Sequence, residues 1–382
     1  MKRINENNLM IIAGEVSGDL HGAHLIKEIL KMNPAVRIFG IGGDKMQAAG
    51  MQAAYHINKM AFLGLTEVIK HLPFIKRVQK DLISIIKEKN IKEVVLIDYP
   101  GFNLNFARKL KKFDIKIFYY ISPQIWAWGA GRIKKIKKLV SKMIIVFPFE
   151  KEFYSKAGVD VEFVGHPLME QIENYSLLSK EMFFHQYDLD SSKDILLILP
   201  GSRKNEVDNL LPETLKAAKK ICREFNLQTV VAGSENIDAE SYSRHQNEFE
   251  FKLITGKTYD LMNLAKFGII KSGTSTLEAG LFQLPMIVIY KTSAITYLIF
   301  KRLVKVNNIG MVNIILGEEV VPELIQKDVN AKTIFEESKK ILSDTVLYNQ
   351  IKDKLGRIKT LLGSSGASRK AASIILLGMN ES

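Results

Sequence analysis

Short runs of aliphatic and β-branched residues alternate with longer segments of helical period along the chain. A first series lies at residues 9–13, 36–41, 94–97, 115–120 and 143–147, and a second at 195–199, 229–232, 267–270 and 286–289. Helix-length segments such as residues 205–224 separate neighbouring runs. Strands that alternate with helices form βαβ units around a parallel sheet. The sequence therefore predicts an α/β protein of two doubly wound, Rossmann-like domains.

The break between the two series lies at Gly165-His166-Pro167, where Gly and Pro interrupt both periods. We expect an amino-terminal domain at residues 1–165 and a second domain from residue 166 onward. Doubly wound domains bind ligands at the carboxyl ends of their strands. The active site is therefore expected in the cleft between the two domains.

The net charge of the 382-residue chain is +13 and is concentrated in the first domain. Residues 1–165 carry 27 basic and 15 acidic residues, a net of 27 − 15 = +12, whereas residues 166–382 carry 27 and 26, a net of +1. A basic half indicates an anionic partner, which leaves nucleic acid, an anionic membrane surface and an anionic substrate open.

The composition excludes several classes of protein. A hydrophobic fraction of 47% with 25% charged residues excludes a disordered or collagen-like chain. The lone cysteine, Cys222, excludes an intramolecular disulfide and a cysteine-built zinc site and favours a reducing compartment. The apolar run after MKRINENN is too short for a secretory signal, and no window reaches the ~18 apolar residues of a spanning helix. We expect a cytoplasmic protein that does not cross a bilayer.

Two motifs of the first domain follow predicted strands. Gly14, Gly18 and Gly22 allow a tight turn with close backbone approach to a ligand, and Ser17 and Asp19 are suited to cap a helix or bind hydroxyls. A plain βα turn explains this spacing equally well. Asp98 follows the run at 94–97, where a partly desolvated carboxylate is suited to act as general base, although it could also begin the next turn.

Three further segments of the first domain remain ambiguous. The aromatic segment at residues 119–129 contains both tryptophans and indicates either a sugar- or lipid-contacting wall or local core. Residues 132–138 alternate basic and apolar residues, as in a phosphate-binding, surface-binding or merely solvated helix. The apolar segment at 60–77 ends in cations and fits a bilayer interface or a buried helix.

Two loops of the second domain suit a nucleoside diphosphate. Residues 199–203, Leu-Pro-Gly-Ser-Arg, combine exposed amides with a guanidinium, although a plain turn with a surface Arg would contain the same residues. Residues 272–278 open a helix with amides and hydroxyls, where phosphate binds well, and Glu278 is placed to accept from ribose hydroxyls or to complement the helix dipole. The chain has no Walker A lysine motif, which argues against a P-loop NTPase.

Together these motifs resemble the lipid-A-disaccharide synthases, the glycosyltransferases of lipid A assembly in Gram-negative bacteria. The matching segments are residues 13–19, 97–98 with Pro100 and 102–103, 122–128, 165–167, 199–203, 273–278, Asn313 and 322–326. The segments at 13–19 and 122–128 are the most specific. Some members have Asp where this chain has Gly101, so a second carboxylate in that loop is not carried over.

The resemblance implies a GT-B fold with an amino-terminal acceptor domain, a UDP-sugar domain at residues 166–364 and a last helix at about 365–382 that packs back on the first domain. It implies condensation of UDP-2,3-diacylglucosamine with 2,3-diacylglucosamine 1-phosphate (lipid X) into a β(1→6) disaccharide, with inversion, release of UDP and no cofactor or metal. It also implies a peripheral protein on the inner face of the inner membrane. A homodimer is left open.

The site residues expected on this basis fall into four groups. Catalytic roles are assigned to Asp98, as base, and Arg203, on the diphosphate. The nucleotide group contains Gly201, Ser202, Arg203, Gly273, Thr274, Ser275, Thr276, Glu278, Asn313 and Gln326. The acceptor group contains Gly14, Glu15, Ser17, Gly18, Asp19, Asn103, Gln124, Trp126 and Trp128. The membrane group contains Phe62, Leu63, Leu65, Val68, Ile69, Leu72, Ile75, Lys76 and Arg77.

Three other functions compete with this interpretation. Another UDP-sugar enzyme of the same fold, such as a muramyl-pathway glycosyltransferase or a UDP-N-acetylglucosamine 2-epimerase, is disfavoured by the motifs at 14–19 and 122–128. In a non-catalytic, nucleotide-dependent membrane-binding protein, Asp98 would be incidental. Nucleic-acid binding rests on the basic half alone, because no recognised module is present, so no nucleic-acid partner is expected.

Overall fold

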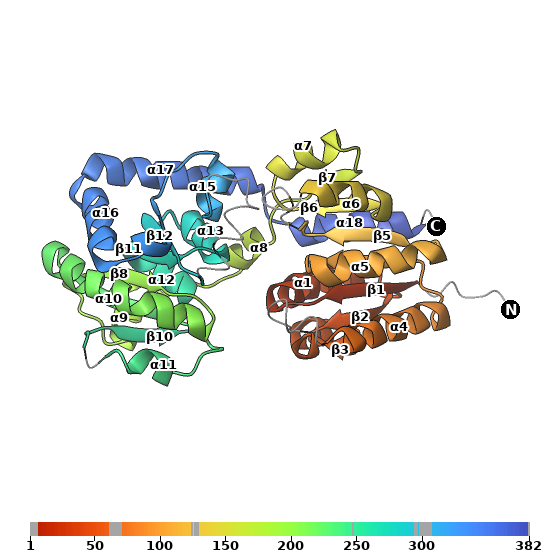
Figure 1. Cartoon of the computed structure of the whole chain (residues 1–382), viewed down its shortest axis with the longest axis horizontal. Coiled ribbons are helices and arrows are strands. Elements are labelled where there is room, and N and C mark those ends of the chain that lie inside the picture. The colour runs from red at the N-terminus through yellow and green to blue at the C-terminus, as the bar shows by residue number, and fades with distance from the viewer. Residues whose placement is uncertain are drawn as a thin grey trace. The chain divides into compact units, whose positions relative to one another are not determined.

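Two compact units make up the protein in this computed structural model, which describes residues 7–60, 71–123, 125, 130–246, 248–293, 297 and 308–380. The first unit contains residues 1–170 and 362–382, and the second contains residues 171–361. Each unit is built around its own parallel sheet (Figure 1). The α/β fold class predicted from the alternating runs is confirmed.

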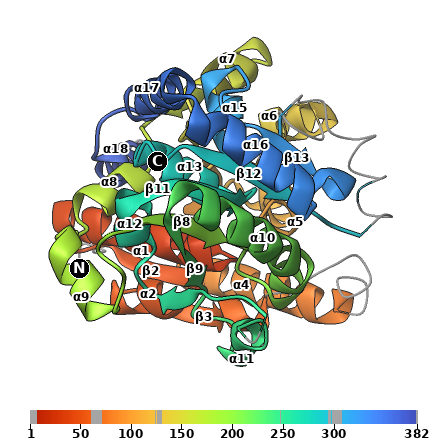
Figure 2. The same cartoon turned by 90° about the vertical axis from the view of Figure 1, so that its left-hand side faces the viewer.

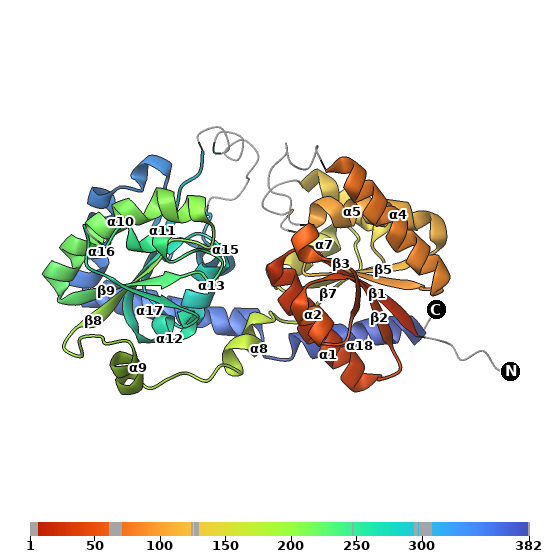
Figure 3. The same cartoon turned by 90° about the horizontal axis from the view of Figure 1, so that it is seen from below.

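A seven-stranded parallel sheet in the order β3-β2-β1-β4-β5-β6-β7 forms the centre of the first unit. Helices α1 and α18 lie on one side of it, and α4 and α5 lie on the other (Figure 3). All six residues of β1 are buried, as expected of a central strand that is covered on both faces. The strands are β1 Asn8–Ala13, β2 Arg37–Gly42, β3 Gln52–His56, β4 Glu93–Ile97, β5 Lys116–Tyr120, β6 Lys142–Ile145 and β7 Val161–Phe163.

The helices of the first unit cover both faces of this sheet. Side chains of α4, α5, α6 and α7 contribute to one continuous hydrophobic core with the strands. The helices are α1 Val16–Met32, α2 Asp44–Ala48, η1 Ile57–Lys59, α4 Leu72–Glu88, α5 Pro100–Leu110, η2 Lys111–Phe113, η3 Ala130–Arg132, α6 Ile133–Leu139, α7 Phe149–Lys156 and α18 Ala367–Asn380. Helix α8, Leu168–Glu173, begins in the first unit and ends in the second.

The carboxy-terminal helix α18 belongs to the first unit although the second unit precedes it in the chain. It packs against α1, and Lys116 Nζ donates to the carbonyl of Gly378 at 3.0 Å. Near the start of α18, the amide of Ser368 donates to Glu170 at 2.8 Å. Within the part of the chain that the structure describes, no helix is long and apolar enough to span a membrane.

A six-stranded parallel sheet in the order β10-β9-β8-β11-β12-β13 forms the centre of the second unit. The long helix α10 lies beside α16 (Figure 2). The strands are β8 Asp194–Leu199, β9 Leu227–Gly233, β10 Lys252–Thr255, β11 Ala265–Lys271, β12 Met286–Tyr290 and β13 Glu323–Ile325. The helices are α9 Lys180–Gln186, α10 Lys204–Phe225, α11 Glu240–Ser243, α12 Thr258–Leu264, α13 Thr274–Leu281, α15 Met311–Leu316, η4 Gln326–Asp328, α16 Ala331–Ser343 and α17 Thr345–Leu362.

Candidate functional site

In the first unit, the predicted catalytic residue and the glycine-rich turn meet where the strand order reverses. Strands β1 and β4 are neighbours in the sheet, and Ala13 pairs with Ile97. The chain therefore continues into Gly14 and into Asp98 at the same sheet edge. Crevices at such reversal points are the usual ligand sites of doubly wound domains.

The turn at Asp98 has an unusual backbone. Asp98 and Tyr99 both have left-handed φ angles, +41° and +46°. Side chains from two elements hold this turn: Asn103 Nδ2 donates to the carbonyls of Ile97 (3.1 Å) and Asp98 (2.8 Å), and the Tyr119 hydroxyl donates to the same Asp98 carbonyl at 2.5 Å. A strained backbone conformation that neighbouring side chains hold in place by hydrogen bonds is typical of functional sites. The predicted acceptor residue Asn103 is fully buried and supports this turn.

The environment of Asp98 suits a general base. Burial, and to a lesser degree the negative charge of Glu15, raise the pKa of the Asp98 carboxyl from 3.8 to about 7. A base is most effective when its pKa lies near the working pH. Glu15 itself is exposed and precedes the first residue of α1.

The other predicted residues of the first turn have separate places. The Asp19 carboxylate is buried and accepts from the amides of Gly43 (2.6 Å), Met46 (3.1 Å) and Lys45 (3.2 Å) at the start of α2. Asp19 therefore connects α1 to α2. Gly18 packs against Ala13, whereas Ser17 is exposed. The predicted Gln124, Trp126 and Trp128 lie outside the described residues.

A cavity of about 610 Å³ opens in the second unit, also at the reversal of its strand order. Strands β8 and β11 are neighbours there, and Leu199 pairs with Ile270, so the turns at 200–203 and 272–275 leave the sheet side by side. Seven predicted nucleotide residues line this cavity: Gly201, Ser202, Arg203, Gly273, Thr274, Ser275 and Glu278.

The first wall of the cavity contains an anion-binding arrangement with a carboxylate beside it. Gly201 has φ +120°, a conformation that favours glycine. The amide of Ser202 donates to Glu206 at 3.1 Å, and Arg203 Nη1 lies 3.4 Å from the same carboxylate. Lys271, at the end of β11, lies 2.9 Å from Glu206. The predicted motif included neither Glu206 nor Lys271.

The second wall is aromatic. The Tyr259 hydroxyl donates to Glu278 at 3.1 Å, and Tyr175 packs edge-on against Tyr259 with ring centroids 5.1 Å apart. Burial raises the pKa of Glu278, and the bond from Tyr259 opposes this shift. Sequence reasoning missed both tyrosines because each stands in a helix or loop without a motif.

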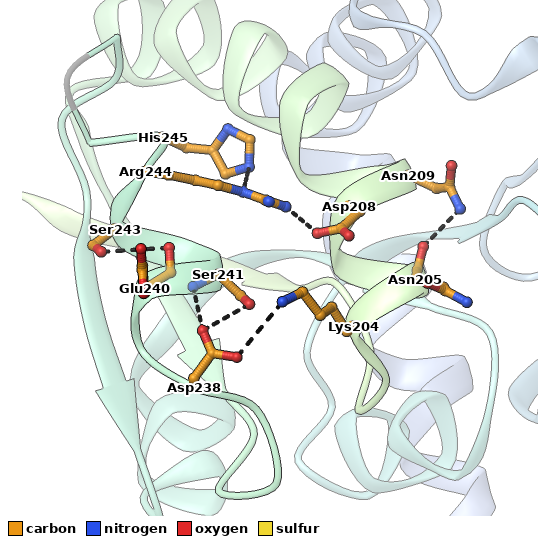
Figure 4. Close-up of polar contacts among 10 residues, drawn as sticks. All are labelled: Lys204, Asn205, Asp208, Asn209, Asp238, Glu240, Ser241, Ser243, Arg244 and His245. Carbon is orange, nitrogen blue, oxygen red and sulfur yellow. Dashed lines mark hydrogen bonds and ion pairs between the residues drawn. The ribbon is translucent and has the colours of Figure 1, made fainter.

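The loop after β9 completes the cavity lining with Ser234, Glu235 and Asn236. Its continuation is fastened to α10 by two ion pairs: Arg244 with Asp208, and Lys204 with Asp238 at 3.9 Å (Figure 4). Asp238 also accepts from the amide and hydroxyl of Ser241. The loop is therefore anchored on the helix that follows the Arg203 turn.

Three predicted nucleotide residues are not among the described residues that line the cavity: Thr276, Asn313 and Gln326. The buried Asn313 amide uses its full hydrogen-bonding capacity within the unit. Its oxygen accepts from the Val320 and Val321 amides, and its nitrogen donates to the Val321 carbonyl and to Glu323. Thr276 accepts from the amide of Met311, and Gln326 bonds both backbone groups of Thr292. These side chains hold loops within the second unit.

The predicted membrane residues are only partly described. Phe62, Leu63, Leu65, Val68 and Ile69 lie outside the described residues. Leu72 is 43% exposed at the start of α4, and Lys76 and Arg77 are exposed on its first turns. Ile75 packs against the hydrophobic core of the first unit, so it is committed to the fold.

A cationic surface lies on α5, η2 and α6, which are adjacent elements. It consists of Arg108, Lys109, Lys111, Lys112, Lys134, Lys135, Lys137 and Lys138. Residues 100–113 and 130–139 contain no Asp or Glu, and no ion pair involves these eight cations among the described residues. Second-unit cations such as Lys216, Lys252, Lys271 and Lys339 are instead ion-paired. The excess charge of the first domain is thus gathered and uncompensated.

Metal ligation has no candidate within the described ranges. There, no cluster of three or more His, Cys, Asp and Glu side chains is arranged to hold a metal ion.

Two parallel α/β units, each with predicted site residues at its strand reversal, have the architecture of the GT-B fold, which glycosyltransferases and nucleotide-sugar epimerases share. A UDP-GlcNAc 2-epimerase from Neisseria meningitidis bound to UDP-GlcNAc aligns with a TM-score of 0.67 at 13% identity over 97% of this chain and 100% of its own. A calicheamicin glycosyltransferase aligns with a TM-score of 0.60 at 14% identity over 98% and 99%. At these identities the similarity shows the fold alone.

The sequence comparisons are more specific. The family described as Lipid-A-disaccharide synthetase matches residues 9–376. The lipid-A-disaccharide synthase of Geobacter metallireducens is 40% identical over 371 residues, 96% of each chain, and that of Syntrophus aciditrophicus is 40% identical over 378 residues, 98% of each. The chain belongs to this family of glycosyltransferases of lipid A biosynthesis, which confirms the resemblance drawn from its motifs.

Proposed function

We propose that this enzyme joins UDP-2,3-diacylglucosamine to 2,3-diacylglucosamine 1-phosphate, giving the β(1→6) disaccharide 1-phosphate and UDP. The family match over residues 9–376 carries this proposal. The two sites support it: a carboxyl whose pKa is raised to about 7 in one unit, and a cavity of about 610 Å³ lined by Arg203 and Lys271 in the other.

In the proposed reaction, Asp98 takes the proton of the acceptor 6-hydroxyl. The hydroxyl oxygen forms a bond to the anomeric carbon of the donor, and the bond from that carbon to UDP breaks with its electron pair leaving on the diphosphate. A single displacement of this kind inverts the anomeric centre. The raised pKa of Asp98 supports this role, because the carboxyl can both accept and retain a proton near pH 7.

The cavity of the second unit is the proposed UDP site. Arg203 and the amides at the start of α13 would balance the charge that develops on the leaving diphosphate. Tyr259 and Tyr175 offer an aromatic wall on which a base could pack. Glu278 is the proposed acceptor for the ribose hydroxyls, because its carboxylate lines the cavity and, among the described residues, accepts a hydrogen bond from Tyr259 alone.

We place the reaction at the inner face of the inner membrane, because a nucleotide sugar meets a lipid acceptor there. The cationic surface of α5, η2 and α6 supports docking on anionic headgroups, since each Lys or Arg near such a surface contributes about 1 kcal/mol. Leu72, Lys76 and Arg77, which are exposed at the start of α4, add one apolar and two cationic side chains to the surface of the same unit.

Mass spectrometry of the product tests the proposal. The purified enzyme, given both acylated sugars, should form a disaccharide 1-phosphate and an equal amount of UDP. Neither sugar alone should release UDP. Conversion of UDP-GlcNAc to its 2-epimer would contradict the proposal and favour an epimerase. UDP release without an acceptor would also contradict it.

A further inference from the structure

The carboxylate of Glu206 contacts three groups at the proposed UDP site. Glu206 Oε1 lies 2.9 Å from Lys271 Nζ and 3.4 Å from Arg203 Nη1, and Glu206 Oε2 accepts from the amide of Ser202. The side chains of Glu206 and Lys271 are only 16% and 20% exposed, whereas that of Arg203 is 62% exposed. The Lys271 pair is therefore the shielded one.

Lys271 stands where an anion would bind. It lines the cavity, and its Nζ lies 3.9 Å from the position that a β-carbon on Gly273 would occupy, beside the amino terminus of α13. The ammonium, the helix terminus and Arg203 thus bring three positive groups to one wall. Glu206 is the acidic side chain paired with both cations.

We propose that Lys271 binds the diphosphate directly and that Glu206 is its displaceable counter-ion. This inference rests on the proposed function of the cavity. A shielded ammonium needs a partner. In the free enzyme Glu206 supplies it, and in the complex the phosphate oxygens do, while Glu206 keeps the Ser202 amide and so holds the 201–203 turn. The negative charge of Glu206 also lowers the affinity for UDP and thereby favours product release.

The two members of this pair should therefore have opposite effects on affinity. Lys271→Met removes a charge-assisted contact and should weaken UDP binding by about tenfold. Glu206→Gln keeps an oxygen for the Ser202 amide but removes the competing charge, so UDP should bind several-fold more tightly. Uridine, which has no phosphate, should bind all variants alike.

Isothermal titration calorimetry with UDP and with uridine on the full-length enzyme provides the test. Lys266→Met is the matched control, because Lys266 lies at the other end of β11 and pairs with Asp194 at 3.4 Å. Lys271→Arg keeps the charge and should keep UDP affinity near that of the wild type. Thermal unfolding of each variant establishes that it is folded.

Three results would overturn the inference. Lys271→Met that binds UDP like the wild type would make Lys271 only a partner of Glu206. Loss of UDP affinity in Glu206→Gln would show that the Glu206 carboxylate maintains the UDP site and does not compete with UDP. Equal losses for UDP and uridine would indicate general damage to the cavity. A wild-type enzyme that binds no UDP would refute the proposed function itself, whereas UDP binding that is indifferent to Lys271 refutes this inference alone.

Discussion

The ring of Tyr99 lies directly against the α-carbon of Gly14, so that the turns after β1 and β4 are in contact. A β-carbon at position 14 would overlap three ring atoms of Tyr99. The ring cannot swing away freely, because its hydroxyl donates to the carbonyl of Met60 at 2.9 Å. Position 14 must therefore be a glycine, because the ring of Tyr99, the residue after Asp98, fills the space of a β-carbon there.

Gly14→Ala should displace Tyr99 and, with it, the adjacent Asp98. We expect a loss of about 1–3 kcal/mol in the free energy of unfolding from overpacking, together with reduced turnover. Urea unfolding and UDP-release assays measure the two effects. Gly101→Ala is the control, since nothing lies within 4 Å of its new β-carbon. Equal behaviour of the two variants would contradict the packing argument.

Asp98→Asn should reduce turnover by about 10²–10⁴-fold, the usual contribution of a general base to the rate, while UDP affinity is unchanged.

In the wild type, kcat/KM should rise with pH through about 7 as Asp98 ionises. Glu15→Gln removes a charge that raises this pKa, so its profile should rise at lower pH. If the pH profile of Glu15→Gln coincided with that of the wild type, Glu15 would have no influence on the pKa of Asp98.

Ionisation of Asp98 should also cost native stability. Its folded pKa of about 7 exceeds the unfolded value of 3.8, so between these pH values the native state binds the extra proton and stability from this group falls as pH rises. Asp98→Asn removes that cost. The free energy of unfolding of the variant, relative to the wild type, should therefore increase from pH 5 to pH 8 in urea titrations. A constant difference would show that Asp98 is not perturbed.

Asn313→Ala should act mainly on stability. The substitution leaves the buried amides of Val320 and Val321 without an acceptor, which should cost about 2–4 kcal/mol. UDP affinity, measured well below the melting temperature, should stay near that of the wild type. Glu278→Gln, on a cavity-lining residue, should show the reverse pattern. A large loss of UDP affinity in folded Asn313→Ala would give this amide a role at the ligand.

Replacing Lys134, Lys135, Lys137 and Lys138 by Gln should strongly reduce binding to phosphatidylglycerol vesicles, at about 1 kcal/mol per charge. These four side chains are exposed on α6, so the fold should persist. Flotation assays measure binding. The control replaces four ion-paired lysines of the second unit: Lys216, Lys332, Lys339 and Lys340. Similar losses of vesicle binding in both variants would show that the net charge of the protein, and not the surface on α6, determines binding.

The predicted and the missed strands differ in their place in the sheets. All nine predicted runs correspond to strands, from β1 to β12. Within the described residues four strands were missed, β3, β7, β10 and β13, and they are the edges of the two sheets. Edge strands are short and half-exposed, so polar residues such as Gln52 and Lys252 interrupt their hydrophobic pattern.

The sequence by itself determined the fold class, the family and the turns that carry Asp98 and Arg203, because hydrophobic period and local motifs are properties of neighbouring residues. Only the tertiary structure separated side chains that line the cavity from those that hold it: Ser275 faces the cavity, whereas Asn313 uses its whole amide within the fold. Only the tertiary structure brought Lys271 to Glu206, 65 positions earlier in the chain. Sheet pairing and burial create such contacts between distant residues, and no local pattern encodes them.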